Sequence, residues 1–145
     1  MNWPKPEPGL VVRYSYLWLR EHRLGREEGI KDRPCAIIVA TLGPEGESRV
    51  LVVPVTHSPP ENVKTALEIP QNIKQHLGLD AGKSWVVLSE SNLFNWPGPD
   101  LRRVGNQGNS SIAYGILPPR FFAEMRRRFL ELEAQAQSNR VQRTD

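Results

Sequence analysis

Two strand-forming runs joined by a turn constrain the fold more than any other feature of this sequence. The runs 36–40 and 49–56 are rich in β-branched residues, and the segment between them, 43–48, is dense in turn-forming residues. This pattern predicts a long antiparallel hairpin. Because a hairpin aligns the outer ends of its two strands, we expect Arg33 and Thr56 to lie at the same edge of a sheet.

The remaining segments predict a mainly β fold. Short runs with strand character recur along the chain, and a proline and a glycine frame one short helix. After Pro118 the apolar period changes to three and four residues, which predicts an amphipathic C-terminal helix. We therefore expect a small half-open barrel of five to six antiparallel strands, covered by that helix. Outside the hairpin the expected strands are 9–14, 65–69, 83–90 and 112–117, the helices are 70–78 and the segment from 118, and 17–24 fits either a strand end or a helical turn.

Three segments differ in their expected order. Residues 1–8 alternate proline with other residues, which predicts an extended lead-in without regular hydrogen bonds. Residues 9–137 carry the strands and helices of one domain. Residues 138–145 are polar without an apolar period, so we expect a disordered tail.

Composition limits the class of protein. The chain has 145 residues, 39% of them hydrophobic, and no apolar run approaches the ~20 residues that span a bilayer. The first eight residues lack the basic start and apolar core of a secretory signal, and one cysteine allows no internal disulfide. We therefore expect a cytoplasmic protein without a membrane partner. A net charge of +3 permits a polyanionic partner without requiring one.

The available side chains favour phosphodiester chemistry without a metal. The single cysteine and the three separated histidines show no metal-ligand spacing, and the sequence has neither a glycine-rich phosphate loop nor a serine nucleophile elbow. We expect no cofactor. A guanidinium at Arg33 can grip two phosphate oxygens and offset the charge that develops when a 2′-hydroxyl attacks phosphorus. Thr56 can donate a hydrogen bond to the same phosphate. His57 adds an imidazole, although a regular strand would direct it to the opposite face.

The order of these residues resembles the MazF/PemK family of bacterial toxins. The resemblance covers about residues 9–132 and depends on Gly9-Leu10-Val11-Val12, Glu28, Arg33-Pro34, Val53-Pro54-Val55-Thr56 and two later strands, 66–69 and 85–88. It implies an SH3-like barrel, a homodimer, and metal-independent cleavage of single-stranded RNA at short sequences. It also implies inhibition by a cognate antitoxin, with DNA binding only through the toxin–antitoxin complex.

The resemblance also assigns roles to individual residues. The family's catalytic arginine and threonine fall on Arg33 and Thr56, with His57 in reserve for proton transfer. Glu28 matches the acidic residue of the family's mobile loop. The residues expected to shape the RNA groove are Glu28, Lys31, Arg26 and Asn92.

One departure from the family leaves other functions open. Many members follow the fifth strand with Asp-Gln-x-Arg-Thr-x-Asp, whereas this chain has Asn92 at the arginine position and Asn95 at the final acid. The segment 96–111 is an insertion relative to a minimal member. The alternatives are a non-catalytic toxin or binding module on the same fold, such as one that grips DNA gyrase, and an RNA-binding protein without cleavage activity.

Overall fold

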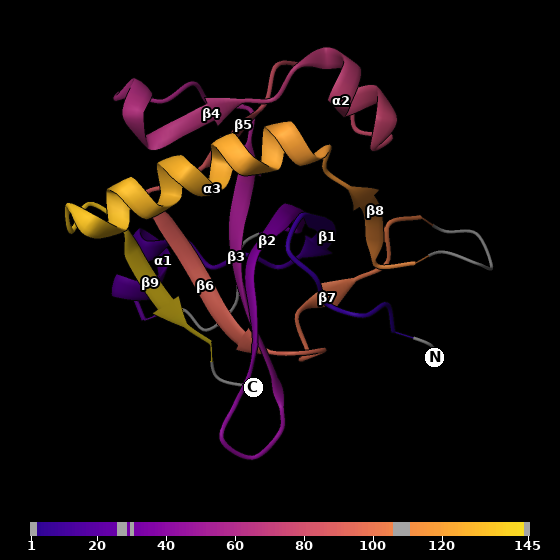
Figure 1. Ribbon diagram of the computed structural model, residues 1–145, viewed down its shortest axis with the longest axis vertical. Helices are drawn as coiled ribbons and strands as arrows, with labels where there is room; N and C mark the ends of the chain where they lie inside the picture. Colours follow the sequence, from indigo (N-terminus) through magenta and orange to yellow (C-terminus); the bar gives the residue numbers. More distant parts are fainter. Residues whose placement is uncertain (1–2, 26–28, 30, 106–110, 144–145) are drawn as a thin grey trace.

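A single bent sheet forms most of the molecule. The computed structural model describes residues 3–25, 29, 31–105 and 111–143. The predicted mainly β class with a short helix and a C-terminal helix is confirmed, and the described part contains nine strands, more than the five to six expected (Figure 1). The strands are β1 (Leu10–Tyr14), β2 (Arg33–Leu42), β3 (Ser48–Thr56), β4 (Ala66–Glu68), β5 (Trp85–Val87), β6 (Glu90–Asn95), β7 (Leu101–Arg102), β8 (Ala113–Ile116) and β9 (Asn139–Gln142). The helices are α1 (Leu19–Arg23), the 3₁₀ turn η1 (Val63–Thr65), α2 (Gln71–His76) and α3 (Pro119–Ala134).

The predicted hairpin is the longest feature of the sheet. Strands β2 and β3 pair antiparallel from Cys35↔Pro54 to Leu42↔Ser48, with an irregularity near Ile38. The start of β3 pairs with β6 and its end pairs with β5, so this strand bends from one part of the sheet into another. The ladder therefore extends the hairpin to its open end, where β2 begins at Arg33 and β3 ends at Thr56.

The two faces of the sheet bury two apolar clusters. Alternation along β2 sends Ala36 and Ile38 to one face, against α3, and Cys35 and Ile37 to the other. Helix α3 lies across the first face, and its apolar stripe of Met125, Phe129 and Leu132 is buried as the period predicts (Figure 1). Burial of one such large side chain contributes about 2–3 kcal/mol to folding.

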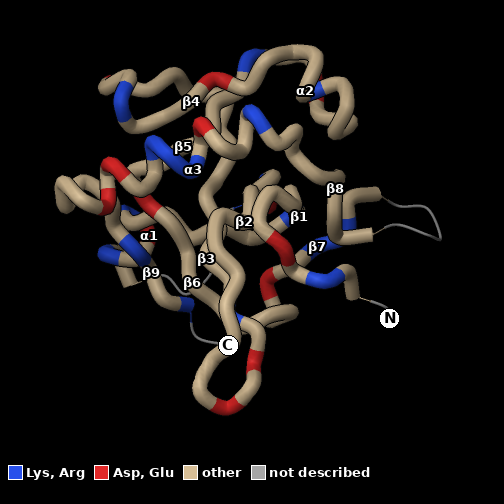
Figure 2. The backbone as a smooth tube through the Cα atoms, viewed as in Figure 1, with Lys and Arg blue, Asp and Glu red and all other residues tan. Residues whose placement is uncertain are grey.

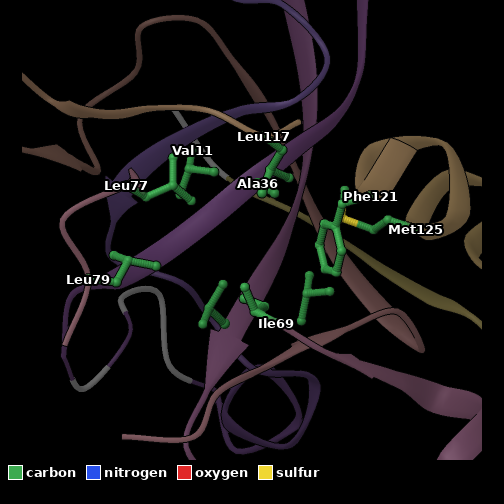
Figure 3. A pocket seen from close by; sticks show the side chains of 10 residues that line it. Val11, Ala36, Ile69, Leu77, Leu79, Leu117, Phe121 and Met125 are labelled. Carbon is green, nitrogen blue, oxygen red and sulfur yellow. The ribbon is translucent and has the colours of Figure 1, made fainter. Parts of the chain in front are cut away.

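Packing beneath α3 leaves almost no space. Apolar side chains from β1, β2, β3, β5, α3 and the segments that flank α2 converge on one another there around a cavity of only about 10 Å³ (Figure 3). That volume is about one water-sized sphere, and an apolar lining offers a water no hydrogen bonds. The region is structural core. Its members Val55 and Leu79 also face the polar pocket described below.

The expected disorder of residues 138–145 is wrong for the part that is described. Residues 139–142 form β9, which pairs parallel with β6, so the sheet continues past the predicted domain end at 137. Arg143 follows this strand and is buried, with its guanidinium on Asp100 (3.0 Å), the Ser15 carbonyl (2.7 Å) and the Tyr14 hydroxyl (3.2 Å). A strand ladder and a buried ion pair hold this segment, although it has little apolar surface of its own.

The helices that the structure describes include none with the length and apolar character needed to cross a membrane.

Candidate active site at the open end of the hairpin

A polar pocket of about 200 Å³ lies at the open end of the β2–β3 hairpin. Its walls come from the segment leading into β2, from the end of β3, and from the loop between α2 and β5. The prediction that Arg33 and Thr56 reach one edge of the sheet is confirmed, because both line this pocket. The lining residues are Lys31, Asp32, Arg33, Pro34, Val55, Thr56, His57, Leu79, Asp80 and Ser84.

Arg33 is half-buried and held in place from two sides. One terminal nitrogen donates a hydrogen bond to the Val55 carbonyl oxygen at 3.2 Å, across the hairpin. The guanidinium carbon lies 4.9 Å from the centre of the Trp18 ring, a cation–π contact. Within the described residues the buried Nε of Arg33 has no hydrogen-bond partner. The guanidinium is thus preorganised beside the pocket, although its buried Nε is left without a partner.

Thr56 presents its hydroxyl beside Arg33. The oxygen accepts a hydrogen bond from the Ser58 amide at 3.2 Å, an arrangement that fixes the side chain where β3 ends. Because this contact uses an oxygen lone pair, the hydroxyl hydrogen can be donated to a ligand. Arg33 and Thr56 therefore offer a charged and a neutral donor to one anion.

His57 leaves the strand and joins the opposite wall of the pocket. Its Nε2 lies 2.9 Å from Oδ2 of Asp80, and its Nδ1 lies 3.0 Å from the carbonyl oxygen of Lys83. Both neighbours are acceptors, so the cationic form of the ring donates at both nitrogens. The side chain is 60% exposed, which leaves space for the ring to exchange one of these contacts for a ligand.

A hydrogen-bond network that sequence patterns did not reveal lies behind this wall. Lys74 of α2 is buried, and its Nζ donates to Oδ1 of Asp80 (2.8 Å), to Oγ of Ser84 (2.7 Å) and to the Gly82 carbonyl. The hydrogen bond from Lys74 is the main cause that holds the pKa of Asp80 below its ordinary value, with smaller contributions from the charges of Lys74 and His57. The only available signal was a lysine beside Ile73 on a short helix, followed by turn-forming residues.

The residues predicted to bind RNA do not all lie at the pocket. Lys31 lines the pocket and is exposed, as a groove residue requires. Arg26 and Glu28 lie outside the described residues. Asp32, which the sequence did not single out, also lines the pocket.

The prediction that Asn92 contacts RNA is wrong. Asn92 is 0% exposed. Its Oδ1 accepts hydrogen bonds from the Leu17 amide (2.9 Å) and from Arg143 (3.1 Å), and its Nδ2 donates to the Leu17 carbonyl (2.8 Å). Strand β6 directs this side chain inward against the segment that precedes α1. Its polar groups are therefore used to attach that segment to the sheet.

Two further observations bear on the function. The described residues contain no group of three or more His, Cys, Asp or Glu side chains placed to hold a metal ion. No protein-family model matches the chain, and a comparison with curated proteins returns no significant match.

Proposed function

We propose that this chain is a metal-independent endoribonuclease that resembles the MazF/PemK toxins and cleaves single-stranded RNA by transesterification. The observation that supports the proposal is the convergence of Arg33, Thr56 and His57 on one solvent-open pocket, with Lys31 at its border. These groups supply two cations, a hydroxyl donor and an imidazole, a set suited to binding a phosphodiester and moving protons around it.

The phosphate is gripped by Arg33 and Thr56. The guanidinium of Arg33 is already held by the Val55 carbonyl and the Trp18 ring. Binding of the phosphate therefore requires little further ordering of this side chain. As the 2′-hydroxyl oxygen attacks phosphorus, negative charge grows on the non-bridging oxygens. Donors in a half-buried pocket stabilise that charge more strongly than water-exposed donors, which lowers the barrier.

Proton transfer is assigned to His57. The 2′-oxygen forms a bond to phosphorus and loses its proton, and the bond from phosphorus to the 5′-oxygen breaks as that oxygen gains one. The products are a 2′,3′-cyclic phosphate and a 5′-hydroxyl. His57 acts after its ring releases the Lys83 carbonyl, while Asp80 holds Nε2. Arg33 is a poor base, because guanidinium stays protonated in proteins.

The same proposal includes the setting that the resemblance implies. The chain acts in the cytoplasm as a homodimer and is restrained by a cognate antitoxin protein. It contacts DNA only as part of the complex with that antitoxin.

The test is RNA cleavage in the presence of a chelator. We expect the purified protein to cut single-stranded RNA, Arg33→Ala to lose cleavage, and Thr56→Val to lose most of it, with melting temperatures close to the parent. Arg126→Ala is the matched control, because Arg126 is an exposed cation on α3 that does not line the pocket. Undiminished cleavage by Arg33→Ala would falsify the assignment.

A non-catalytic binding module is the second candidate, favoured by two specific observations. Both ring nitrogens of His57 already have partners, and the residue at the family's arginine position, Asn92, is structural. Under this alternative the pocket binds an anionic partner and leaves RNA intact. Recovery of a topoisomerase from lysate by the parent, its loss with Arg33→Ala, and uncut RNA would together favour it.

A further inference from the structure

A second cationic site lies beside the pocket, on strands β1 and β7. Arg13 of β1 is directly opposite Arg102 of β7 in the sheet register. Like charges directly opposite on paired strands destabilise a sheet, so the arrangement is unfavourable unless an anion compensates it. Figure 2 shows Lys and Arg segments on both strands where they meet.

A single carboxylate stands between the two guanidiniums. Oδ2 of Asp32 lies 3.8 Å from Nη2 of Arg13, and Oδ1 lies 3.7 Å from Nε of Arg102. Both separations exceed a hydrogen bond. One carboxylate thus partly offsets two cations, and the side chains of Arg13 and Arg102 remain 37% and 36% exposed. The cluster therefore keeps a net positive charge that a bound anion can share.

Hydrogen bonds to backbone carbonyls orient the guanidiniums of Arg13 and Arg102 without using all of their N–H donors. Nη1 of Arg13 donates to the Arg103 carbonyl at 3.1 Å, and Nη1 of Arg102 donates to the Pro99 carbonyl at 2.7 Å. Each guanidinium is steadied at one nitrogen while others face Asp32. This is the geometry of fixed forks, which recognise phosphate better than a freely rotating cation.

The cluster is continuous with the pocket. Asp32 belongs to both, and Pro34, which lines the pocket, is directly opposite Arg13 in the sheet. Arg13 is thus one strand spacing from the pocket and Arg102 two, at about 4.8 Å each. A nucleic acid strand whose phosphate occupies the pocket meets the two arginines with its next nucleotide.

An aromatic side chain completes this surface. Tyr114 of β8 is half-buried against the core beneath α3, and β8 pairs with β1 beside Arg13. Burial raises the pKa of the Tyr114 hydroxyl; the positive charge of Arg13 opposes the rise, and the carboxylates of Asp32 and Asp80 add to it. Strands β8 and β7 pair with successive residues of β1, so Tyr114 and Arg102 belong to neighbouring strands along one edge of β1. Aromatic faces between cations are platforms on which unpaired bases stack.

We propose that Arg13, Arg102 and Tyr114 form a second nucleotide subsite, in which the arginines bind the phosphate next to the cleaved one and the tyrosine stacks on a base of single-stranded RNA. This inference rests on the proposed function, since it takes the occupant of the pocket to be an RNA strand. It adds a binding surface that supplies affinity and substrate length dependence without taking part in bond cleavage.

The experiment measures binding separately from cleavage. The probe is a fluorescein-labelled single-stranded RNA with a 2′-O-methyl group on every ribose, which binds but has no 2′-hydroxyl to attack. We expect Arg13→Gln and Arg102→Gln each to weaken binding roughly five- to tenfold at low salt and to reduce the salt slope by about 0.7. Tyr114→Leu weakens binding about tenfold with an unchanged slope. Arg126→Gln, the exposed control on α3, stays within about twofold of the parent.

A variant that is expected to bind more tightly separates an effect on binding from an effect of misfolding. Asp32→Asn removes the carboxylate between the arginines, so we expect it to tighten binding roughly two- to fivefold, a result that a damaged fold does not produce. Arg13→Lys and Arg102→Lys keep the charge but not the planar fork, so we expect the salt slope of the parent and a smaller loss of affinity than in the glutamine variants. The inference is overturned if the glutamine and leucine variants bind like Arg126→Gln, or if Asp32→Asn weakens binding.

Failure of the subsite differs from failure of the nuclease. Cleavage that needs Arg33 but is indifferent to Arg13, Arg102 and Tyr114 rejects the subsite alone. Binding that needs these three residues in a protein that never cuts RNA rejects the nuclease and leaves a single-strand binding surface. A matched DNA probe that binds as tightly as the RNA rejects selectivity for RNA.

Discussion

Lys74 and Asp80 form an ion pair that joins a buried side chain to an exposed one, with Nζ of Lys74 2.8 Å from Oδ1 of Asp80. The lysine side chain is 1% exposed and the aspartate side chain is 61% exposed. The buried ammonium thus holds an exposed carboxylate, whose other oxygen meets His57. Through this contact the packing of α2 on the sheet sets the position of one wall of the pocket.

The two partners of this pair are expected to differ in their effect on stability. Asp80→Ala removes the counter-charge of a buried ammonium that keeps its other hydrogen bonds, which costs about 1–3 kcal/mol, whereas Lys74→Met replaces the buried charge by an apolar chain of similar length and costs less. Urea unfolding of both variants measures the difference. A larger loss for Lys74→Met would show that the lysine contributes through its hydrogen bonds rather than through the charge pair.

The same pair predicts how stability responds to acid. Because the folded state lowers the pKa of Asp80 below its ordinary 3.8, the contribution of this carboxylate is fully present above that value. It is lost as the pH falls below about 4 and passes through the folded-state pKa. We expect the parent to lose more stability than Asp80→Asn between pH 5 and pH 3, measured by urea midpoints. Parallel curves for the two proteins would contradict this.

The hairpin half of the site was predictable and the other half was not. Turn residues between two β-branched runs set the strand pairing that places Arg33 near Thr56. Because the two strands are neighbours along the chain, this pairing is predictable from the sequence. Asp80 reaches the pocket only because α2 packs on the sheet and buries Lys74. Lysine is rarely buried, so no pattern of residue types indicates that contact. It depends on tertiary structure.

Short polar strands were missed for a related reason. Strand β9 has one buried apolar residue, Val141, and its pairing with β6 joins residues about fifty positions apart. Strand β6 buries two consecutive polar residues, Ser91 and Asn92. Polar residues in sequence usually indicate an exposed position or a turn. Neither strand has the period-two signal that revealed the hairpin. Hydrogen bonds and the ion pair of Arg143 hold this edge.

Removal of the Arg143 side chain tests whether that ion pair anchors the C-terminal strand. The guanidinium is 2% exposed and Asp100 is 8% exposed, so Arg143→Met leaves a buried carboxylate without this cation. We expect a loss of about 3–5 kcal/mol in urea unfolding. Arg140→Met is the control, because Arg140 pairs with Glu133 at the surface, where such a pair contributes below about 1 kcal/mol. Equal losses in the two variants would reject the anchoring role.

The buried thiol of Cys35 provides a way to observe opening of the hairpin. Cys35 is fully buried, and burial raises the pKa of its thiol far above the ordinary value, so the reactive thiolate is scarce in the folded state. We expect a thiol-specific chromogenic reagent to label the native protein only as fast as the structure opens, and to label it at once in denaturant. Because Arg143 stabilises the same side of the sheet, Arg143→Met speeds native labelling in proportion to its loss of stability. Rapid labelling of the folded parent would mean that β2 opens locally, and the preorganised position of Arg33 would then lose its support.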